Sequence, residues 1–320
     1  MKTFQMQWVH DCEFVLSFKK NVRRELTMNK KVLISVLAAA ATCTLVFAGC
    51  GEAVTNISST PASATGSTVA GENQNDKISG TLTLNGSTSM TQVCQALGEA
   101  FQAKYQDVKV EKAGTGSGAA VQAVESGNAL IGDLSRDLKE DENPDQFEKV
   151  QIAIDGIAVA VNKNNPVTDL TTEQVTKIFS GEITNWKDVG GEDHAITVLG
   201  REANSGTRDG FEGIFKADKY AYAAELTSTG EVVNRIGSDP YAIGYISLGS
   251  VNDTVAACKI DGVEATEENV SNGTYTASRP FIQIYKKGSD SELIQAWFDF
   301  IKSEEGQAVI KEAGVIPVTK

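Results

Sequence analysis

Apolar residues along this chain fall into two kinds of pattern. Runs of β-prone residues predict strands: 82–84, 108–110, the longer 152–161, and 196–199. Stretches with apolar residues every three or four positions predict helices: 93–105, 119–124, 173–179, 210–215 and 292–309. Because the two kinds of segment alternate, the sequence predicts an α/β fold in which helices cover the faces of a sheet.

The N-terminal part of the chain does not share this alternation. Met28 opens a short basic segment, and the 18 uncharged residues 32–49 end on Ala48-Gly49 before Cys50. A basic head, an apolar middle and a small-residue exit indicate a signal peptide at 28–49. A transmembrane helix is the alternative, since 18 apolar residues could just cross a bilayer, but the small-residue exit and the polar stretch behind it argue against it. Residues 1–27 precede this complete signal, so we interpret them as an upstream-start artefact.

Cys50 and the segment after it suggest how the mature protein begins. The exit resembles a bacterial lipobox, with Phe47 where leucine is usual, which would make Cys50 the lipid-modified first residue. The segment 50–79 is rich in Ser, Thr, Ala, Gly and Asn and has almost no large apolar residue. Such a stretch buries too little surface to fold, so we expect a flexible linker to a lipid anchor.

The chain as a whole is acidic, and the part after residue 49 is more so. The whole chain has a formal net charge of −13, and loss of residues 1–49, which hold seven Lys or Arg and three Asp or Glu, would leave 22 basic and 39 acidic residues, a net charge of −17. Such a surface disfavours nucleic acid as a partner and gives no attraction to anionic lipid. An anion could still bind at preorganised donors, because exposed charges farther than about 8 Å are largely screened at physiological salt.

Cysteine and histidine give no metal site. Only Cys94 and Cys258 lie in the expected folded body, where one disulfide or two buried free thiols are both open. The body has one histidine, His194, in a polar Gly/Glu/Asp turn that we interpret as solvated. No Cys/His cluster has metal-ligand spacing, so neither a metal nor a cofactor is expected.

Three loops share one design, in which a strand ends, a Gly/Ser/Thr-rich turn follows and a helix begins. They are 86–89 (Gly-Ser-Thr-Ser), 114–118 (Gly-Thr-Gly-Ser-Gly) and 204–207 (Asn-Ser-Gly-Thr). A helix N-terminus has unpaired N–H groups and a partial positive charge, glycine lets the backbone approach a ligand, and hydroxyls add donors. Any one loop could be a plain turn with a helix cap. Three in one chain favour an oxyanion-binding site.

Arg201 lies four residues before Ser205 of the third loop. A guanidinium is planar, permanently charged and able to donate two parallel hydrogen bonds to a tetrahedral oxyanion. The alternative is a surface arginine paired with Glu202 or Asp209. Beside Ser-Gly-Thr at a helix start, we favour ligand contact for Arg201.

The ordered set of motifs resembles the phosphate-binding lipoproteins of phosphate ABC importers, from about residue 80 to 318. The motifs are Gly-Ser-Thr-Ser-Met (86–90), Gly-Thr-Gly-Ser-Gly (114–118), Ile-Phe-Ser-Gly-Glu-Ile-Thr-Asn-Trp (178–186), Gly-Arg-Glu-Ala-Asn-Ser-Gly-Thr (200–207) and Ile-Gly-Tyr-Ile-Ser (243–247). The resemblance implies a type 2 periplasmic-binding-protein fold: two α/β lobes, each a mixed sheet flanked by helices, joined by two crossing strands. We expect a first lobe of 80–157 and 247–320 and a second of 158–246.

The resemblance also implies which residues contact the ligand. The first lobe would supply Thr88, Ser89 and Ser117, and the second lobe would supply Arg201, Ser205, Gly206 and Thr207. Many members have an aspartate after the third strand that accepts the proton of hydrogen phosphate. Ser135 stands at that place here, and we expect it to accept a hydrogen bond while Arg136 adds a charge. Asp133 is near, but the alternation of side chains along a strand would point it elsewhere.

The expected function is capture of inorganic phosphate outside the cytoplasm, by a monomer that delivers it to the permease and ATPase subunits of an ABC importer. A binding protein for sulfate, molybdate or tungstate is one alternative, because Ser135 replaces the aspartate. An enzyme acting on phosphate esters is disfavoured, because neither a Gly-x-Ser-x-Gly elbow nor a phosphate-loop Gly-Lys-Ser/Thr pattern occurs and nothing singles out a pair of carboxylates. An adhesin or sensor that keeps the fold is the third alternative.

Overall fold

The fold is taken from a computed structural model, which describes residues 78–318. The leader 1–27, the signal peptide 28–49, the lipidation site Cys50 and all but the last two residues of the predicted linker lie outside the described residues. Within the described range, no helix is long and apolar enough to cross a membrane. No cluster of three His, Cys, Asp or Glu that could hold a metal ion occurs between residues 78 and 318.

Three parallel strands begin the fold: β1 (Gly80–Gly86), β2 (Val108–Gly114) and β3 (Ile131–Leu134). β1 lies between the other two, and Gly86 is in register with both Gly114 and Asp133. The strands are connected by α2 (Thr91–Lys104) and α3 (Ser117–Glu125). Because the carboxyl ends of parallel strands meet at one edge of the sheet, the loops after β1, β2 and β3 are neighbours.

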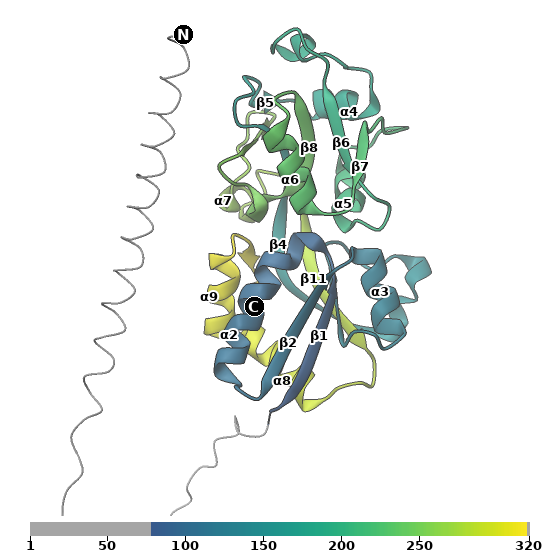
Figure 1. The fold of residues 1–320 in the computed structure, drawn as a ribbon, viewed down its shortest axis with the longest axis vertical. Coiled ribbons are helices and arrows are strands. Elements are labelled where there is room, and N and C mark those ends of the chain that lie inside the picture. The colour runs from purple at the N-terminus through teal and green to yellow at the C-terminus, as the bar shows by residue number, and fades with distance from the viewer. Residues whose placement is uncertain (1–77, 319–320) are drawn as a thin grey trace, which may run out of the picture. The chain divides into compact units, whose positions relative to one another are not determined.

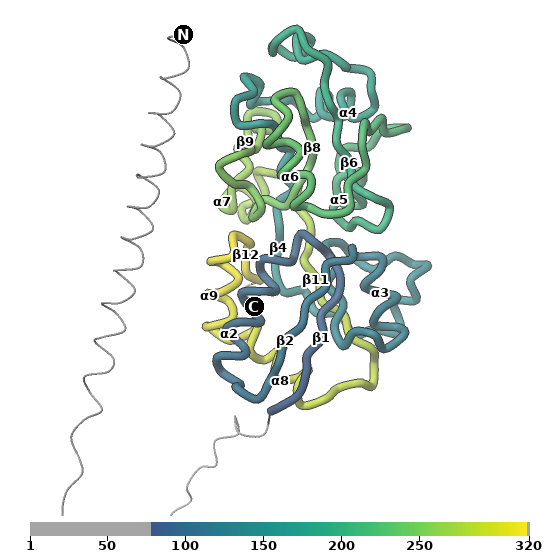
Figure 2. Tube along the Cα trace, in the orientation of Figure 1, coloured from purple at the N-terminus to yellow at the C-terminus, as the bar shows by residue number. Residues whose placement is uncertain are grey.

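Two long strands, β4 (Phe147–Asn162) and β11 (Ser278–Lys286), connect this sheet to a second group of strands (Figures 1 and 2). β11 pairs antiparallel with β3 on one side and with β4 on the other. Farther along, β4 pairs antiparallel with β8 (Ala242–Ser247), so the ladder continues in the order β2-β1-β3-β11-β4-β8-β6-β7. These are the two crossing strands that the sequence analysis expected.

The second group is built around β6 (Thr197–Arg201), which pairs parallel with β8 and with β7 (Ala224–Leu226). Its helices are α4 (Thr172–Ser180), α5 (Gly206–Ile214), α6 (Thr229–Ser238) and the short α7 (Glu267–Ser271). A small sheet of β5 (Asp169–Leu170) and β10 (Lys259–Ile260), and β9 (Val255–Ala257) at the end of β4, complete it.

Each group of elements has its own hydrophobic core. Phe101, Trp297 and Phe300 are buried together in the first group, with their rings in tilted and edge-to-face contact. Phe179, Phe211 and Tyr245 form the aromatic centre of the second. Cys94 is buried in the first core and Cys258 in the second, and both are free thiols, which excludes the disulfide that the sequence left open.

The core contacts draw the boundary between the lobes differently from the sequence. Cys258, Ile260, Val270 and Tyr275, which we expected in the first lobe, pack with Val159 in the second core. The chain does not return after β8, because β9 pairs with β4 and α7 packs on it; it returns at β11. We therefore assign 78–155 and 279–318 to lobe I and 156–278 to lobe II, and use these names below.

The C-terminal helical pattern is divided in two. α8 (Glu292–Lys302) ends where Ser303 takes an extended backbone, and α9 (Glu304–Glu312) begins after it. The Ser303 hydroxyl accepts a hydrogen bond from the backbone N–H of Gly306, as an N-cap residue does. The apolar spacing continues across the break, which is why the sequence predicted one helix over 292–309.

Candidate functional site

The loop after β1 is held by its own backbone. The N–H of Ser87 donates to the carbonyl of Asp133 on β3 at 2.8 Å, and the Ser87 hydroxyl accepts from the N–H of Ser89 at 3.3 Å. Gly86 has φ +145°, and a Cβ there would lie 2.2 Å from the Asp133 carbonyl oxygen. Only glycine fits so close to the neighbouring strand. Thr88 and Ser89 are thereby fixed at the sheet edge, in the first turn before α2.

The three loops of lobe I bring three buried serines together, which we call the serine cluster: Ser87, Ser117 and Ser135. Ser87 Oγ donates to Ser135 Oγ at 2.8 Å, and the N–H of Ser135 donates to Ser117 Oγ at 3.1 Å. Ser117 is the first residue of α3, so the N-terminus of this helix faces the cluster. The cluster presents hydroxyls and a helix N-terminus, and both stabilise an anion.

Lobe II supplies Arg201, at the end of β6, which is 1% exposed. Its Nε donates to the carbonyl of Leu226 and its Nη2 to the carbonyl of Thr227, both at 3.0 Å. Nη1 also reaches the hydroxyl of Thr229, and Nη2 reaches the hydroxyl of Thr88 in lobe I, both at 3.2 Å. Every acceptor around this guanidinium is therefore a neutral oxygen.

The charge of Arg201 is left without an internal counter-ion. Among the described residues, no carboxylate lies within ion-pair distance of it, and both Glu202 and Asp209 stay outside that distance. Burial lowers the pKa of Arg201 to about 10, which still leaves it charged at neutral pH. A buried cation held by neutral groups is costly, and an anion bound beside it would offset that cost.

The third predicted loop forms the N-terminus of α5. The Ser205 hydroxyl caps the helix by accepting from the N–H of Arg208 at 3.3 Å. A Cβ on Gly206 would lie 2.3 Å from Ser117 Oγ and 2.6 Å from Ser135 Oγ. The first turn of α5 therefore points directly at the serine cluster, and Gly206 has to be glycine for the two lobes to meet there.

Hydroxyls from the two lobes also meet at the rim of this site. Ser89 Oγ of lobe I lies 2.8 Å from Thr207 Oγ1 and 3.1 Å from Thr229 Oγ1 of lobe II. Thr229, at the start of α6, is a site residue that the sequence analysis missed. Its signal was present, because Thr227-Ser228-Thr229-Gly230 follows a strand and opens a helix just as the three predicted loops do.

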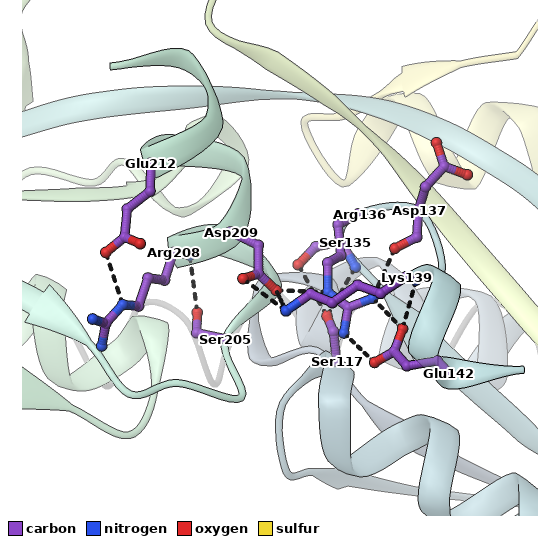
Figure 3. A network of polar contacts seen from close by, with 10 residues as sticks. All are labelled: Ser117, Ser135, Arg136, Asp137, Lys139, Glu142, Ser205, Arg208, Asp209 and Glu212. Atoms are coloured by element: carbon purple, nitrogen blue, oxygen red, sulfur yellow. Dashed lines mark hydrogen bonds and ion pairs between the residues drawn. The ribbon is translucent and has the colours of Figure 1, made fainter. Parts of the chain in front are cut away.

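Arg136 lies beside the serine cluster but is held by other groups. Its Nη1 and Nη2 donate to the two carboxylate oxygens of Glu142 at 2.8 and 2.6 Å, and its Nε donates to Asp209 at 2.7 Å (Figure 3). The expectation that Arg136 adds a charge to the ligand site does not fit this geometry, because two carboxylates already occupy its donors. Ser135, in contrast, lies in the serine cluster, and its contact with a ligand stays a prediction.

Asp133 is directed away from the site, as alternation along β3 predicted. Its carboxylate accepts from Lys112 Nζ and from Gln283 Nε2, both at 2.8 Å, on the other face of the sheet. Burial disfavours the charged form of Lys112, but the attraction of Asp133 outweighs this and raises the pKa of Lys112. The carboxylate of Asp133 is therefore engaged elsewhere, and the contacts of the serine cluster and Arg201 include no carboxylate.

A cavity of about 460 Å³ adjoins the site at its rim. Thr88, Ser89 and Thr229 line it on the side of Arg201, and the rest of its lining is uncharged and includes the amides of Gln92, Gln95 and Asn234. The cavity therefore offers a polar, uncharged approach to the hydroxyls that surround the arginine.

Comparisons with known proteins agree with this architecture. The family model of the PBP superfamily domain matches residues 64–305. The chain is 34% identical over 297 residues to the phosphate-binding protein PstS of Bacillus subtilis, covering 91% of this chain and 95% of that relative. It is 31% identical over 274 residues to PstS of Pseudomonas aeruginosa, covering 75% of this chain and 84% of that relative.

Solved structures give the same result. The putative phosphate ABC transporter substrate-binding protein of Clostridium perfringens, solved with bound phosphate, matches with a TM-score of 0.71 and 41% identity, covering 75% of this chain and all of that one. An ABC-type phosphate transport receptor from Vibrio cholerae matches with a TM-score of 0.62 and 35% identity, covering 74% of this chain and all of that one. The predicted two-lobed type 2 fold is confirmed, and the chain belongs to the PBP superfamily and, within it, to the PstS family of substrate-binding proteins.

Proposed function

We propose that this protein captures inorganic phosphate outside the cytoplasm and delivers it to an ABC importer. The relatives support the ligand, since the Bacillus subtilis protein is named for phosphate binding and the Clostridium perfringens structure contains phosphate. The geometry supports it independently, because the two lobes present hydroxyls, two helix N-termini and one arginine toward the same point.

The observation that carries the proposal is Arg201. A guanidinium that is 1% exposed and surrounded by neutral oxygens alone has its charge free for an external anion. Its planar donors match a tetrahedral oxyanion, and the hydroxyls of Thr88 and Thr229 already lie against them. A ligand with one or two negative charges at this place would form an ion pair with Arg201 and offset the cost of burying its charge.

The proposed ligand contacts come from both lobes. Lobe I supplies Thr88, Ser89, Ser117 and Ser135, while lobe II supplies Arg201, Ser205, Gly206, Thr207 and, in addition, Thr229. An anion that touches both sets binds the closed arrangement more tightly than an open one. Binding would therefore shift the protein toward closure through differential affinity alone.

Calorimetric titration of the purified full chain with phosphate, followed by sulfate, tests the proposal. We expect saturable 1:1 binding of phosphate and much weaker binding of sulfate. Absence of phosphate binding would refute the function, and sulfate binding as tight as phosphate binding would refute the specificity.

One observation favours a second candidate ligand class. The contacts of the serine cluster and Arg201 contain no carboxylate, because Asp133 is paired with Lys112 and Gln283. Sulfate, molybdate and tungstate carry no proton and are satisfied by donors, so such a site could also hold them. The same titration, extended to molybdate and tungstate, separates these candidates from phosphate.

The finer parts of the proposal concern the setting of the protein. It would act as a monomer without catalytic activity, anchored through a lipid on Cys50 and working with the permease and ATPase subunits of the importer. Incorporation of a labelled palmitate in cells, lost in Cys50→Ala, would test the anchor. Incubation with a generic phosphomonoester would test the absence of catalysis, since turnover contradicts a purely binding role.

A further inference from the structure

A cluster of charged side chains bridges the two lobes beside the ligand loops. Asp209 on α5 of lobe II accepts from Arg136 Nε at 2.7 Å and from Lys139 Nζ at 3.0 Å, and both donors belong to lobe I (Figure 3). Glu142, also of lobe I, pairs with the other two nitrogens of Arg136. We call Arg136, Lys139, Glu142 and Asp209 the interlobe cluster.

The geometry of the cluster favours a strong interaction. Arg136 and Glu142 form two parallel hydrogen bonds, which fixes the plane of the guanidinium and leaves Nε directed at Asp209. The side chain of Arg136 is 8% exposed, that of Glu142 15% and that of Asp209 25%, so salt screens these charges less than it screens surface pairs. Within lobe I the arginine and glutamate are therefore a preformed receptor for one carboxylate of lobe II.

Asp209 belongs to the same helix as the proposed ligand loop. It lies four residues after Ser205, and its backbone N–H donates to the carbonyl of Ser205 at 3.0 Å. Any movement that withdraws the first turn of α5 from the serine cluster must also withdraw Asp209 from Arg136. The interlobe cluster and the ligand loop therefore open and close together.

We propose that the interlobe cluster is a latch, in which Arg136, Lys139, Glu142 and Asp209 act as positioning residues that hold α5 closed over the ligand and set how long it stays bound. The proposal rests on the proposed function for the identity of the ligand. It also gives Arg136 a role that accounts for its position next to Ser135 without contact to phosphate. The latch forms only on closure, so it should slow release and leave association nearly unchanged.

Stopped-flow measurement of phosphate release and association in Asp209→Asn tests the latch in the full chain. Loss of one charge-assisted hydrogen-bonded pair at a partly buried position should accelerate release about 10-fold, with association within about twofold of the parent. Asp193→Asn is the matched control, because Asp193 pairs with Lys187 inside lobe II and bridges no lobes. A release rate for Asp209→Asn equal to that of Asp193→Asn would overturn the proposal.

A second measurement reports contact between the two lobes and does not depend on phosphate release. The backbone N–H of Gly118 in lobe I donates to the carbonyl of Asn204 in lobe II at 3.1 Å, so its hydrogen exchange reports contact between the lobes. In the absence and presence of phosphate, Asp209→Asn should exchange this amide faster than the control, while the thermal unfolding midpoints of the two variants stay similar. Equal exchange at Gly118 in the two variants would refute the latch.

The two measurements also separate the latch from the ligand assignment. If the parent chain binds no phosphate, the proposed function fails, yet exchange at Gly118 in phosphate-free buffer still decides whether the charged cluster holds the lobes together. Conversely, if the parent binds phosphate normally and the Gly118 amide exchanges equally fast in Asp209→Asn and Asp193→Asn, the latch is refuted and the proposed function stands.

Discussion

Arg201 and Arg136 make a natural comparison, because each lies at or just after the end of a strand, each is buried and each was expected to contact the ligand. Arg201 is 1% exposed and is surrounded by neutral carbonyl and hydroxyl oxygens. Arg136 is 7% exposed and is bound by two carboxylates. One guanidinium therefore has only neutral partners and the other has two negatively charged partners, although both are buried. Burial alone does not identify a ligand contact.

The difference shows which observation has diagnostic value. A buried cation with internal carboxylate partners is already compensated, and it stabilises the structure or its closure. A buried cation with neutral partners keeps an unfavourable desolvation cost, which an external anion can offset. The absence of a counter-ion therefore points to the ligand more directly than the presence of an arginine.

Arg279 extends the comparison to the crossing between the lobes. It is 5% exposed on β11, and its Nε and Nη2 donate to Asp155 on β4, at 3.1 and 2.9 Å. Ser247 at the end of β8 donates to the other oxygen of the same carboxylate. Like Arg136, Arg279 has a carboxylate as its partner, and it joins the two crossing strands.

The largest expected effect is that of Arg201→Met on ligand binding. Removal of the uncompensated cation leaves the bound phosphate without its ion pair, which should cost about 3 kcal/mol or more, a loss of at least about 100-fold in affinity. Calorimetric titration with phosphate measures it. The comparison breaks if Arg201→Met binds phosphate within a factor of three of the parent, since the guanidinium would then not contact the ligand.

Arg136→Met should instead act on stability. Its removal takes the guanidinium partner from Glu142 and leaves Asp209 with Lys139 as its one cationic partner, so the free energy of unfolding in phosphate-free buffer should fall by about 2 kcal/mol. Arg201→Met should lower it by no more than about 1 kcal/mol, because only neutral groups lose a partner. Urea denaturation of both variants measures the contrast, and equal losses would argue against the electrostatic distinction between the two arginines.

Gly206→Ala probes the contact between α5 and the serine cluster. The new methyl group would lie 2.3 Å from Ser117 Oγ, so the lobes cannot close as observed without displacing a ligand-contact residue. Overpacking of this kind costs about 2 kcal/mol, which predicts roughly 30-fold weaker phosphate binding. The control is Gly213→Ala on the same helix, where nothing lies within 4 Å of the new Cβ. Equal affinities of the two variants would contradict the close approach.

Much of this site was predictable because its parts are local in sequence. The loops at 86–89, 114–118 and 204–207 each mark a strand end and a helix start. The first two lie together because the parallel strands β1 and β2 end at one edge, and the third reaches them from lobe II. Arg201 was predictable from its place before Ser205. The direction of Asp133, away from the site, followed from the alternation of side chains along a strand.

The remainder depends on partners that are distant in the chain. Asp209 lies 73 residues from Arg136, so the sequence around Arg136 does not indicate that its Nε is already occupied. The second crossing strand, β11, contains buried polar residues such as Arg279 and Gln283, so its sequence does not resemble an apolar core strand. Thr229 was missed because a Ser-Thr-Gly helix start is also what a simple cap looks like.

The smallest expected effect concerns acid. Burial works against the charged form of Glu142, but the hydrogen bonds and charge of Arg136 prevail and lower the pKa of Glu142. A carboxylate whose pKa is lower in the folded state contributes stability that is fully present above its unfolded pKa, about 4.3, and is lost as pH falls through the lower folded value.

Glu142→Gln removes this contribution, so its free energy of unfolding should fall less steeply than that of the parent as the pH is lowered from about 4.5 toward 3. Urea denaturation at a series of pH values measures the two slopes, with Glu148→Gln as the control, since Glu148 is exposed on β4 and forms no ion pair with another described residue. Parallel curves for the parent and Glu142→Gln would mean that Arg136 does not hold Glu142 ionised. The charge of Arg136 would then not be compensated by Glu142, and its contrast with Arg201 would fail.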